Sequence, residues 1–404
     1  MKSIRQRFSV EFSYDVHFTE DLFHPDNPLL ADTIDDASEP LPKKMVAVVD
    51  EGLLPHHDDL LDRIGAYAEA HADVLTLSAS PIVVPGGEAA KNDPALVDHV
   101  HEVIYETRLD RHAYVMGVGG GAVLDLAGYA AGTAHRGIRL IRVPTTVLSQ
   151  NDSGVGVKNG INAFDTKNFL GTFEPPHAVL NDATFLRTLD DRDWRAGVSE
   201  AIKVALLKDA DFFEYLRAHA TDLAPPTRDL EAMRHVVYRC AELHLDHIAT
   251  SGDPFEKGSS RPLDFGHWAA HKLEELTDYD LRHGEAVAIG IALDCAYSHL
   301  IGRLSRDALE QILDLTAALG FDLYVPELEA HVDEPEHPRC LFQGLDSFRE
   351  HLGGELTIML LDAIGEGVEV HSVDRARYRE AIALLRERAA TASSPEHVTP
   401  SGSS

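Results

Sequence analysis

Tyr114-Val-Met-Gly-Val-Gly-Gly-Gly-Ala-Val-Leu-Asp125 is the stretch that decides the fold of the first half of this chain. An apolar run ends in a series of glycines, and a second run with helical spacing follows. This order predicts a buried strand, a tight turn and a helix. Glycines let the backbone approach a pyrophosphate, and a helix N-terminus favours its negative charge. The spacing of Gly117, Gly119 and Ala122 fits the G-x-G-x-x-A variant of the dinucleotide-binding signature.

The usual acidic partner of this signature is missing from its expected place. About twenty residues further on, where an acid would bind a ribose, residues 137–143 carry arginines. Asp50, at the end of an earlier apolar run, could take that role. A tight strand-to-helix turn without a ligand is the alternative interpretation of the glycines.

Strand-like and helix-like segments alternate around the glycine turn, and an opening β-segment is predicted from Arg7 to Phe18. Such alternation is typical of a parallel sheet covered by helices. We therefore expect a Rossmann-like α/β domain that binds NAD over residues 1–190. The predicted strands are 45–50, 74–77, 82–84, 113–117 and 140–144, and the predicted helices are 58–70, 94–108 and 121–131.

From about Trp194 the pattern changes to long segments with helical periodicity. We expect an all-α domain over residues 191–389. The tail over residues 390–404 is rich in Ser, Thr and Pro, which predicts disorder. The predicted helices of the second domain are 195–208, 211–220, 228–250, 265–276, 284–302 and 307–319.

The composition excludes several classes of partner. The 404 residues carry a formal net charge of −31, so general binding to nucleic acids or anionic membranes is excluded, because phosphates would be repelled. The three cysteines are widely spaced, which fits a reducing compartment rather than a disulfide framework. No signal peptide or transmembrane span is visible, so a cytoplasmic location is expected.

Three side chains in the second half form a candidate metal site: Glu200, His267 and His283. Two imidazoles and one carboxylate leave an open position on a divalent ion, as in catalytic zinc sites. Taken alone, each residue has an ordinary explanation. Glu200 could be a solvated carboxylate on a helix, His267 could pair with His271 by chance, and His283 could be a capping or core histidine. A metal together with a nicotinamide suggests that an alcohol or carbonyl is polarised next to a hydride acceptor.

A loop between the two halves concentrates positive charge. Lys158 and Lys167 lie in a segment rich in Gly, Asn and Asp. In so acidic a chain they could hold a phosphate and a cofactor, or the segment could be a solvated loop.

The order of these motifs resembles that of the sugar phosphate cyclase superfamily, whose best-known member is 3-dehydroquinate synthase. The resemblance covers residues 45 to 370 approximately. The motifs that carry it are Pro85-Gly-Gly-Glu88 with Lys91, Gly119-Gly-Gly with Asp125, Arg136-Gly137, Pro144-Thr-Thr146, Asp152 with Lys158, Lys167-Asn168, Glu200-x-x-Lys203, Asp253-x-x-Glu256, Phe265-Gly-His267 with His271, and His283-Gly-Glu285.

The resemblance implies a role for each matching position. Glu200, His267 and His283 would bind Zn²⁺ or Co²⁺. The catalytic side chains would be Lys203, His271, Lys158, Asp152, Asn168 and Glu256. The substrate contacts would be Arg136, which binds the phosphate from its own or a neighbouring subunit, Asp246, Asp264 and Arg261. The NAD contacts would be Asp50, Glu88, Lys91, Gly119, Gly120, Gly121, Asp125, Thr145, Thr146, Leu148, Asp152, Lys167, Phe185, Thr188 and Leu189.

The resemblance also implies a mechanism that does not consume the cofactor. NAD oxidises a ring hydroxyl polarised by the metal, phosphate is eliminated, and NADH returns the hydride. The ring then opens and closes again by an intramolecular aldol addition. His271 and the lysines would relay protons and stabilise oxyanions. The expected partners are a small sugar phosphate and a second copy of the chain in a homodimer, with no nucleic acid and no membrane.

Several positions depart from the dehydroquinate synthase pattern. Asp246 stands where those enzymes have a lysine, Ser260 and Asp264 stand where they have arginine and asparagine, and residues 347–350 replace an Asp-Lys-Lys turn. In the parent enzyme the lost cations hold a substrate carboxylate. Their replacement by acids should repel a carboxylate and favour hydroxyl groups.

Two neighbouring arginines weaken this interpretation. Arg261 and Arg349 lie one residue from the lost cations and could partly replace them. The segments 252–256 and 261–274 nevertheless resemble the 2-epi-valiolone synthase and EboD-like branches of the superfamily. The retained His271 argues against the 2-epi-5-epi-valiolone branch.

The sequence therefore predicts a carbon–oxygen lyase that converts sedoheptulose 7-phosphate to a valiolone-type cyclitol. One alternative is a 3-dehydroquinate synthase that acts on 3-deoxy-arabino-heptulosonate 7-phosphate. Another is a metal-dependent NAD alcohol dehydrogenase, which shares this architecture.

Overall fold

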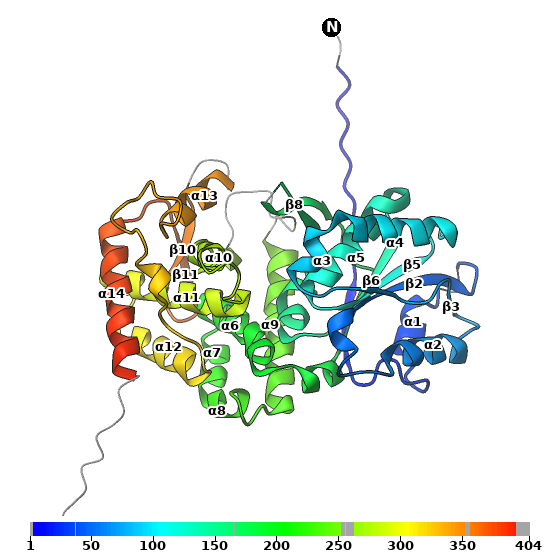
Figure 1. The fold of residues 1–404 in the computed structure, drawn as a ribbon, viewed down its shortest axis with the longest axis horizontal. Coiled ribbons are helices and arrows are strands. Elements are labelled where there is room, and N and C mark those ends of the chain that lie inside the picture. The colour runs from blue at the N-terminus through cyan, green and yellow to red at the C-terminus, as the bar shows by residue number, and fades with distance from the viewer. Residues whose placement is uncertain are drawn as a thin grey trace, which may run out of the picture. The chain divides into compact units, whose positions relative to one another are not determined.

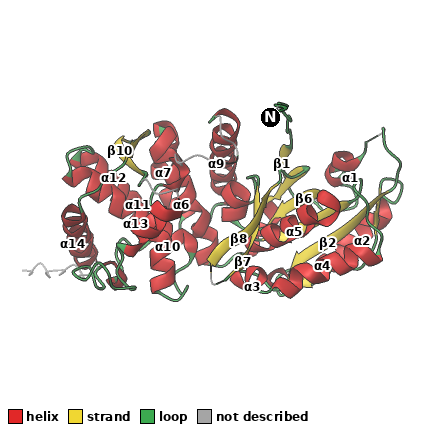
Figure 2. Cartoon of the chain, turned by 90° about the horizontal axis from the view of Figure 1, so that it is seen from above, coloured by secondary structure: helices red, strands yellow, loops and turns green. Residues whose placement is uncertain are grey.

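The computed structural model describes residues 3–36, 38–164, 166–251, 255, 262–351 and 356–392. The chain forms two compact units, Met1–Leu189 and Asp190–Ser404. Figure 1 shows the elements of each unit, and Figure 2 shows the strands and helices in a second view. Four residues that carried sequence predictions lie outside the described residues: Asp253, Glu256, Ser260 and Arg261. The predicted tail over residues 390–404 lies outside them from residue 393 onward.

Unit 1, Met1–Leu189, contains a seven-stranded sheet in the order β1-β9-β6-β5-β2-β3, with β4 also beside β2. The strand pairs are parallel, so the predicted parallel α/β architecture is confirmed. The strands are β1 (Asp15–Thr19), β2 (Lys43–Asp50), β3 (Leu75–Leu77), β4 (Ile82–Val84), β5 (Tyr114–Gly119), β6 (Arg139–Pro144) and β9 (Ala178–Asp182).

Helices cover both faces of this sheet. The alternation along β2 shows why: Met45, Ala47 and Val49 belong to one core, while Val46 and Val48 belong to the other. The first core includes side chains of α1 and α2, and the second includes side chains of α4 and α5. A strand buried on both faces is apolar throughout, as its sequence showed. The helices are α1 (Leu29–Ile34), α2 (Leu60–Ala70), α3 (Glu88–Asn92), α4 (Pro94–Glu106) and α5 (Gly121–Thr133).

The sequence analysis named no element for α1, α3 or β9. Two further features of unit 1 differ from the sequence prediction. The strand predicted from Arg7 begins only at Asp15, because its partner β9 begins at Ala178, directly opposite Asp15. An antiparallel hairpin of β7 (Lys158–Ala163) and β8 (Thr166–Phe173) occupies part of the segment read as a polar loop. Much of β8 is exposed, so its residues lack the apolar alternation that marks a half-buried strand.

Unit 2, Asp190–Ser404, is helical, as expected, but it also contains a hairpin of β10 (Ile358–Ala363) and β11 (Glu366–Val370) that was not predicted. Helix α14 extends to Ala392, beyond the expected start of the tail at residue 390. In the described part of the chain, no helix combines the length and apolar character needed to cross a bilayer. The helices are α6 (Asp191–Lys208), α7 (Ala210–Ala218), α8 (Ala220–Leu223), α9 (Leu230–Thr250), α10 (His267–Leu276), α11 (His283–Leu300), α12 (Arg306–Ala318), α13 (Gln343–His351) and α14 (Arg375–Ala392).

Helix α11 is the centre of unit 2. It is buried continuously from Ala286 to Ser298 and packs against α6, α10, α12 and α14. A helix that is apolar on all sides must be enclosed by others. Two glycines set how closely α11 approaches its neighbours. A Cβ atom on Gly284 would overlap the carbonyl oxygen of Ala196 in α6, and one on Gly290 would overlap that of Gly266, which precedes α10.

A buried carboxylate ties α11 to α10 and α14. Asp294 is 0% exposed and accepts hydrogen bonds from Trp268 Nε1 at 3.0 Å and Tyr378 Oη at 2.8 Å. Its other oxygen accepts from the backbone N–H of Gly266 at 3.2 Å. Burial raises the pKa of Asp294 to about 7, although these hydrogen bonds oppose the shift.

The Asp294→Asn substitution should reveal this raised pKa through stability. The group has an ordinary pKa of 3.8, so between pH 7 and pH 5 the folded chain binds a proton that the unfolded chain does not. The free energy of unfolding of the wild type should therefore rise by about 2 kcal/mol relative to the variant as the pH falls over that range. Denaturant titrations at both pH values measure this difference, and an equal pH dependence of the two proteins would contradict it.

The Gly290→Ala substitution should destabilise unit 2, because the added methyl group collides with backbone rather than with a movable side chain. The expected loss is about 1–3 kcal/mol in the free energy of unfolding. Both tryptophans, Trp194 and Trp268, belong to unit 2, so tryptophan fluorescence during denaturation reports on this unit.

Gly65 in α2 offers a matched control, since a Cβ atom there meets nothing within 4 Å. The Gly65→Ala substitution should stabilise unit 1 by about 0.5–1 kcal/mol through helix propensity, measured by circular dichroism. If Gly65→Ala and Gly290→Ala both lower the free energy of unfolding, the backbone contact at Gly290 is not the reason for the loss of stability in Gly290→Ala.

Candidate functional site

In unit 1 the glycine turn joins β5 to α5. Gly119 ends the strand, Gly120 is the N-cap and Gly121 begins the helix. No side chain caps this helix, in contrast to α4, which Asp93 caps. The first backbone N–H groups of α5 therefore have no capping side chain, which is the arrangement that binds a phosphate group in dinucleotide folds.

Asp50 lies beside this turn at the end of β2. A Cβ atom on Gly119 would lie 2.9 Å from Cβ of Asp50, and one on Gly86 would lie 2.5 Å from its Oδ1. The Asp50 carboxylate accepts a hydrogen bond from the N–H of Gly52 at 2.8 Å. Burial raises its pKa, while hydrogen bonds from Gly52 and Gly120 oppose that shift. The structure thus brings an acid to the carboxyl edge of the sheet next to the glycines, where such folds bind a ribose.

Two ion-pair networks fasten the β7–β8 hairpin to α3 and α5. Lys91 is 7% exposed, and its Nζ lies 2.5 Å from Asp125 Oδ2 and donates to Asn168 Oδ1. Burial raises the pKa of Asp125, and Lys91 opposes the shift. A buried charge needs such a partner to be tolerated.

The second network centres on Glu88, whose carboxylate lies 3.2 Å from Nζ of Lys167 and accepts from Nδ2 of Asn162 at 2.8 Å. Four predicted NAD contacts therefore pair with one another or with the hairpin. Contact of these four side chains with NAD stays a prediction. Asn162 was missed by the sequence analysis, because nothing in its local pattern distinguishes it.

Arg142 is a second residue that the sequence analysis missed. It is 0% exposed in β6 and donates to the backbone oxygens of Gly154 at 3.0 Å, Gly156 at 2.6 Å and Lys158 at 2.8 Å. These bonds fix the segment that carries Asp152 and Lys158. A lone arginine within an apolar strand was the available signal, since a buried charge must find partners.

The segment after β6 lies against the glycine turn. The N–H of Thr145 donates to the oxygen of Gly119 at 3.1 Å. Thr146 exchanges hydrogen bonds with Ser149, directly after Leu148. The predicted NAD contacts at Thr145, Thr146 and Leu148 are thus adjacent to the turn.

Other predicted residues of unit 1 lie elsewhere. Arg136 is exposed and follows the C-terminal end of α5, which is 13 residues long. That length places it about 20 Å from the glycine turn. Phe185 is only 3% exposed and packs in the core, so it supports the sheet rather than offering a free surface. Thr188 accepts or donates a hydrogen bond with His57 Nε2 at 2.9 Å, and Leu189 ends the unit.

In unit 2 the three predicted metal ligands meet. Glu200 lies within α6 and is 0% exposed, while His267 and His283 are the first residues of α10 and α11. The Nε2 atoms of the histidines lie 3.7 Å and 3.6 Å from the same carboxylate oxygen, Glu200 Oε1. One ligand atom from each residue lies within 4.8 Å of the others.

The opposite ring nitrogens show that this donor set fits a metal ion. His267 Nδ1 lies 3.1 Å from the oxygen of Phe265, and His283 Nδ1 lies 3.4 Å from Glu274 Oε2. Metal-binding histidines commonly donate their second N–H to a carbonyl or a carboxylate, which directs the free nitrogen at the ion. Two imidazole nitrogens and one carboxylate oxygen suit a divalent ion with open positions.

The protonation states follow from burial and charge. Burial lowers the pKa of His267 well below its usual range, as does the neighbouring Lys203. Burial would raise the pKa of Glu200, but Lys203 and His283 lower it to about 2. Burial would lower the pKa of His283, but Glu200 and Glu274 raise it to about 10. Metal binding needs neutral imidazoles, so a metal ion would compete with the proton that Glu200 and Glu274 favour on His283.

Two further predicted residues lie beside the ligands. Lys203 is 2% exposed and forms an ion pair with Glu200, one helical turn away. The ring of His271 lies 5.5 Å from that of His267 and 6.0 Å from that of His283, and its side chain is exposed. His271, Glu274 and His283 form a second possible ligand group. We favour the first group, because its nitrogens converge on one buried oxygen.

The predicted substrate contacts of unit 2 are only partly described. Asp264 is half-buried in a short 3-10 turn, Pro262–Asp264, which packs against α6. Asp246 is exposed on α9, which also packs against α6. Glu256 and Arg261 belong to the residues that are not described.

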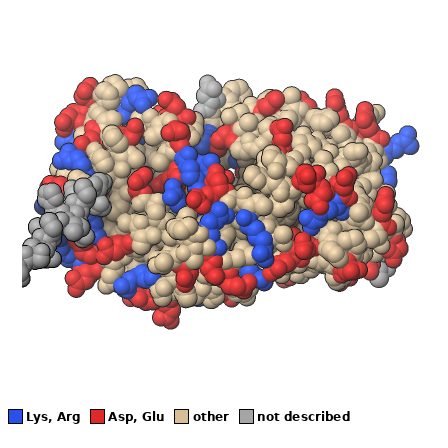
Figure 3. Space-filling view, turned by 60° about the horizontal axis from the view of Figure 1, so that its bottom comes forward, with Lys and Arg blue, Asp and Glu red and all other residues tan. Residues whose placement is uncertain are grey.

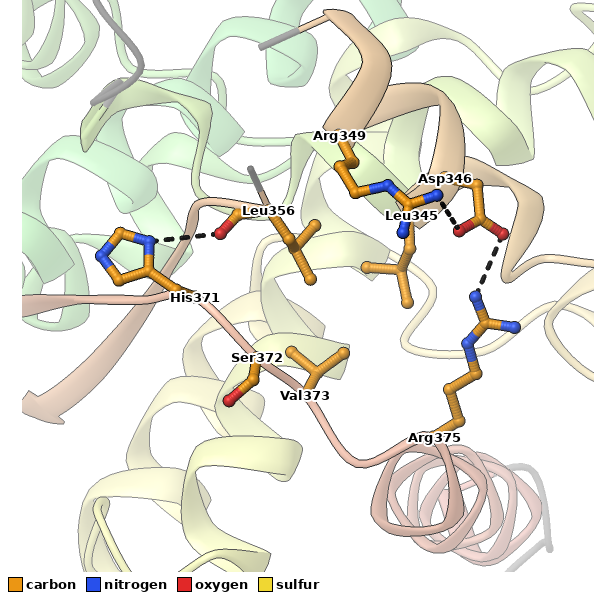
Figure 4. Close-up of a pocket in the computed structure, with 8 residues that line it drawn as sticks. All are labelled: Leu345, Asp346, Arg349, Leu356, His371, Ser372, Val373 and Arg375. Carbon is orange, nitrogen blue, oxygen red and sulfur yellow. Dashed lines mark hydrogen bonds and ion pairs between the residues drawn. The ribbon is translucent and has the colours of Figure 1, made fainter. Parts of the chain in front are cut away.

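A pocket of 440 Å³ shares no lining residue with this cluster (Figure 4). Arg349 and Arg375 contact the two oxygens of Asp346 there, at 3.4 Å and 3.0 Å. Arg349 is therefore paired with an acid of its own helix, α13. The residues that line the pocket are Leu345, Asp346, Arg349, Leu356, His371, Ser372, Val373 and Arg375.

Known proteins match this chain over most of its length. The family models for the N-terminal and C-terminal parts of 3-dehydroquinate synthase match residues 81–196 and 197–335. A 3-dehydroquinate synthase of Halorhodospira halophila is 35% identical over 332 residues, which cover 80% of this chain and 89% of that protein. A 2-epi-5-epi-valiolone synthase of Streptomyces glaucescens is 33% identical over 362 residues, which cover 89% and 87%.

Solved structures show the same relationship. The structure of a 2-epi-5-epi-valiolone synthase from Streptomyces hygroscopicus, with NAD⁺ and Zn²⁺ bound, has a TM-score of 0.81 at 30% identity. The match covers 95% of this chain and 100% of that one. A butanol dehydrogenase of Thermotoga maritima, with a TM-score of 0.62 at 15% identity, shows the fold alone. The predicted resemblance is confirmed: the chain belongs to the 3-dehydroquinate synthase family of sugar phosphate cyclases.

Proposed function

We propose that this chain cyclises sedoheptulose 7-phosphate to a valiolone-type cyclitol, close to 2-epi-valiolone, with NAD and a divalent metal as cofactors. The carbon–oxygen bond to phosphate breaks, and an intramolecular aldol addition forms the new carbon–carbon bond. The observation that carries the choice of substrate is an acidic residue, the half-buried Asp264, three residues before the predicted ligand His267.

The charges near the metal cluster support a substrate without a carboxylate. Asp264 packs with its turn against α6, which carries Glu200 and Lys203. A fixed acid there repels a substrate carboxylate but accepts hydrogen bonds from hydroxyl groups. Arg349, which could have replaced a lost cation, is occupied by Asp346 at 3.4 Å.

The residues of each unit supply the parts of such a reaction. When bound, NAD would take up and return a hydride, and the metal would polarise the oxygen of the hydroxyl group whose carbon is oxidised. Glu200, His267 and His283 would hold the metal. Lys203, buried and cationic beside them, stabilises negative charge that develops on a substrate oxygen. The exposed His271 can take up and pass on protons.

A 3-dehydroquinate synthase activity is the second candidate, and relatives of that name at 35% and 36% identity favour it. Its substrate, 3-deoxy-arabino-heptulosonate 7-phosphate, carries the carboxylate that Asp264 should repel. The alcohol dehydrogenases share only the fold at this level of identity.

The first test is to incubate the purified chain with NAD, Zn²⁺ or Co²⁺ and each of the two C7 sugar phosphates. We expect phosphate release from sedoheptulose 7-phosphate without net NADH formation, because the hydride returns within each turnover. Absorbance at the NADH band, a phosphate assay and NMR of the product measure these outcomes. Phosphate release chiefly from the carboxylated sugar would overturn the substrate, and net NADH would indicate a dehydrogenase.

The Asp264→Asn variant sharpens this test, since it removes the charge but keeps the size. We expect the ratio of kcat/KM for the carboxylated sugar over sedoheptulose 7-phosphate to rise about tenfold. An unchanged ratio would show that Asp264 does not select the substrate.

A second prediction concerns the metal rather than the substrate. The Glu274→Gln substitution should weaken metal binding about 10- to 100-fold, because Glu274 orients His283 through Nδ1. Competition with a chelating dye measures the affinity. Glu275→Gln is the matched control: that neighbour is exposed and pairs with Lys272 at 2.7 Å.

The same measurement distinguishes the two ligand groups. A His271→Ala variant should keep its metal affinity if Glu200, His267 and His283 are the ligands. A large loss in this variant, or an equal effect of both glutamine substitutions, would contradict the assignment.

A further inference from the structure

We propose that Glu285 is a positioning residue for the predicted metal site and acts through its neighbour His283. Arg192 of α6 binds the Glu285 carboxylate and thereby holds the first turn of α11, where His283 lies. Glu285 ends the His-Gly-Glu motif of the sequence, but the proposed function gives it no role. The inference rests on the metal ligands assigned there, Glu200, His267 and His283.

The Glu285 carboxylate closes the first turn of its own helix. Its Oε2 atom accepts a hydrogen bond from the backbone N–H of Arg282, directly before His283, at 3.1 Å. A glutamate at the third helical position that binds back to this N–H group is half of a capping box, which stabilises the first turn. The direction of the backbone that carries His283 therefore depends on where this carboxylate lies.

Two arginines of α6 fix the position of that carboxylate. Arg192 donates from Nε to Oε1 of Glu285 at 2.9 Å and from Nη2 to Oε2 at 2.6 Å, so one guanidinium holds both oxygens. Arg195 Nη2 lies 3.3 Å from Oε1. Arg192 Nη2 also donates to the backbone oxygen of Asp280, shortly before α11, at 2.8 Å. A bidentate pair of this kind sets direction as well as distance.

A second set of ion pairs joins the same two helix starts with the charges exchanged. Arg282 Nη1 donates to Asp193 Oδ1 at 2.5 Å and to Asp190 Oδ1 at 3.2 Å. An arginine before α11 thus binds acids at the start of α6, while arginines of α6 bind an acid of α11. His283 lies between Arg282 and Glu285 in the sequence, so its backbone is held on both sides.

Helix α6 connects these ion pairs to the other side of the metal cluster. The helix begins at Asp191, is buried continuously from Ala196 to Leu207 and carries Glu200 within that part. His283 Nε2 lies 3.6 Å from Glu200 Oε1. Ligands of a functional site must stay within about 0.5 Å of their productive geometry. A first turn of α11 that is no longer held to α6 should therefore bind a metal ion less tightly.

The burial of Glu285 distinguishes this pair from ordinary surface ion pairs. Basic side chains lie beside acidic ones on the face of the molecule shown in Figure 3, and exposed pairs of that kind contribute little. The side chain of Glu285 is only 12% exposed, and that of Arg192 is 40% exposed. A carboxylate so far removed from water needs a partner in a fixed place.

The test measures the Zn²⁺ affinity of the purified full chain by competition with a chelating dye. Arg192→Gln and Glu285→Gln should each weaken binding about tenfold. Glutamine at position 285 can still accept the N–H of Arg282, so this variant tests the contact with α6. The double variant should lose less than the product of the two single losses, because the two side chains act as one unit.

A spectroscopic measurement accompanies the affinities. The visible absorption of bound Co²⁺ depends on the geometry of its ligands, so it should change in both single variants. Unchanged affinity and absorption, or independent losses that multiply in the double variant, would overturn the proposal. Circular dichroism of every variant verifies that the fold is retained.

Arg239→Gln is the matched control for a general loss of stability in unit 2. Arg239 of α9 donates to Asp209 Oδ2 from Nε at 3.0 Å and from Nη2 at 2.5 Å. These side chains are 35% and 12% exposed, close to the values for Arg192 and Glu285. Asp209 lies between α6 and α7 and not beside a predicted ligand, so the Zn²⁺ affinity should change by less than about twofold. A loss equal to that of Arg192→Gln would contradict a positioning role.

The His283→Ala variant separates failure of this proposal from failure of the proposed ligand set. We expect it to lose more affinity than Glu285→Gln, because it removes a ligand. A large loss in His283→Ala with none in Glu285→Gln would overturn the positioning role alone. An unchanged affinity in His283→Ala would overturn the ligand set and the positioning role with it.

Discussion

The close approach of backbone at two glycines of α11 is the constraint on which the cluster of predicted metal ligands depends. Gly284 lies against Ala196 of α6, and Gly290 lies against Gly266. The first contact joins the helix of Glu200 to that of His283, and the second places the turn before His267. Side chains of ordinary size would hold the helices apart by at least a methyl group. The two histidines can approach one oxygen of Glu200 only because no side chain intervenes between these backbones.

Unit 1 uses the same principle around its glycine turn. Gly119 allows Asp50 and the first turn of α5 to meet at the carboxyl edge of the sheet. Buried charges then hold the surrounding loops: Arg142 binds three backbone oxygens, and Lys91 joins Asp125 to Asn168. Each charge is costly to bury and is tolerated because it has several partners. Polar residues thus position the segments of this unit, while the apolar cores supply its stability.

Local patterns predicted most elements, and the exceptions have physical reasons. The period-2 pattern from Arg7 to Phe18 is a strong strand signal, but a strand forms only where a partner exists, and β9 reaches only to Asp15. The β7–β8 hairpin escaped prediction because its residues are largely exposed and polar. Glu274 and Asn162 were missed for another reason. They contact His283 and Glu88, which are distant in the sequence, and no local spacing predicts such contacts.

The sequence by itself determined the alternation of strands and helices and the glycine turn, because these depend on residue type and short spacing. The order of its motifs predicted Glu200, His267 and His283 as metal ligands. Only the tertiary structure decided that Glu200, His267 and His283 converge, since that requires α6, α10 and α11 to pack at backbone contact. The tertiary structure also shows that Arg136 lies the length of α5 away from the glycine turn. It shows in addition that Arg349 forms an ion pair with Asp346. Proximity between distant segments is a property of packing, which no local pattern contains.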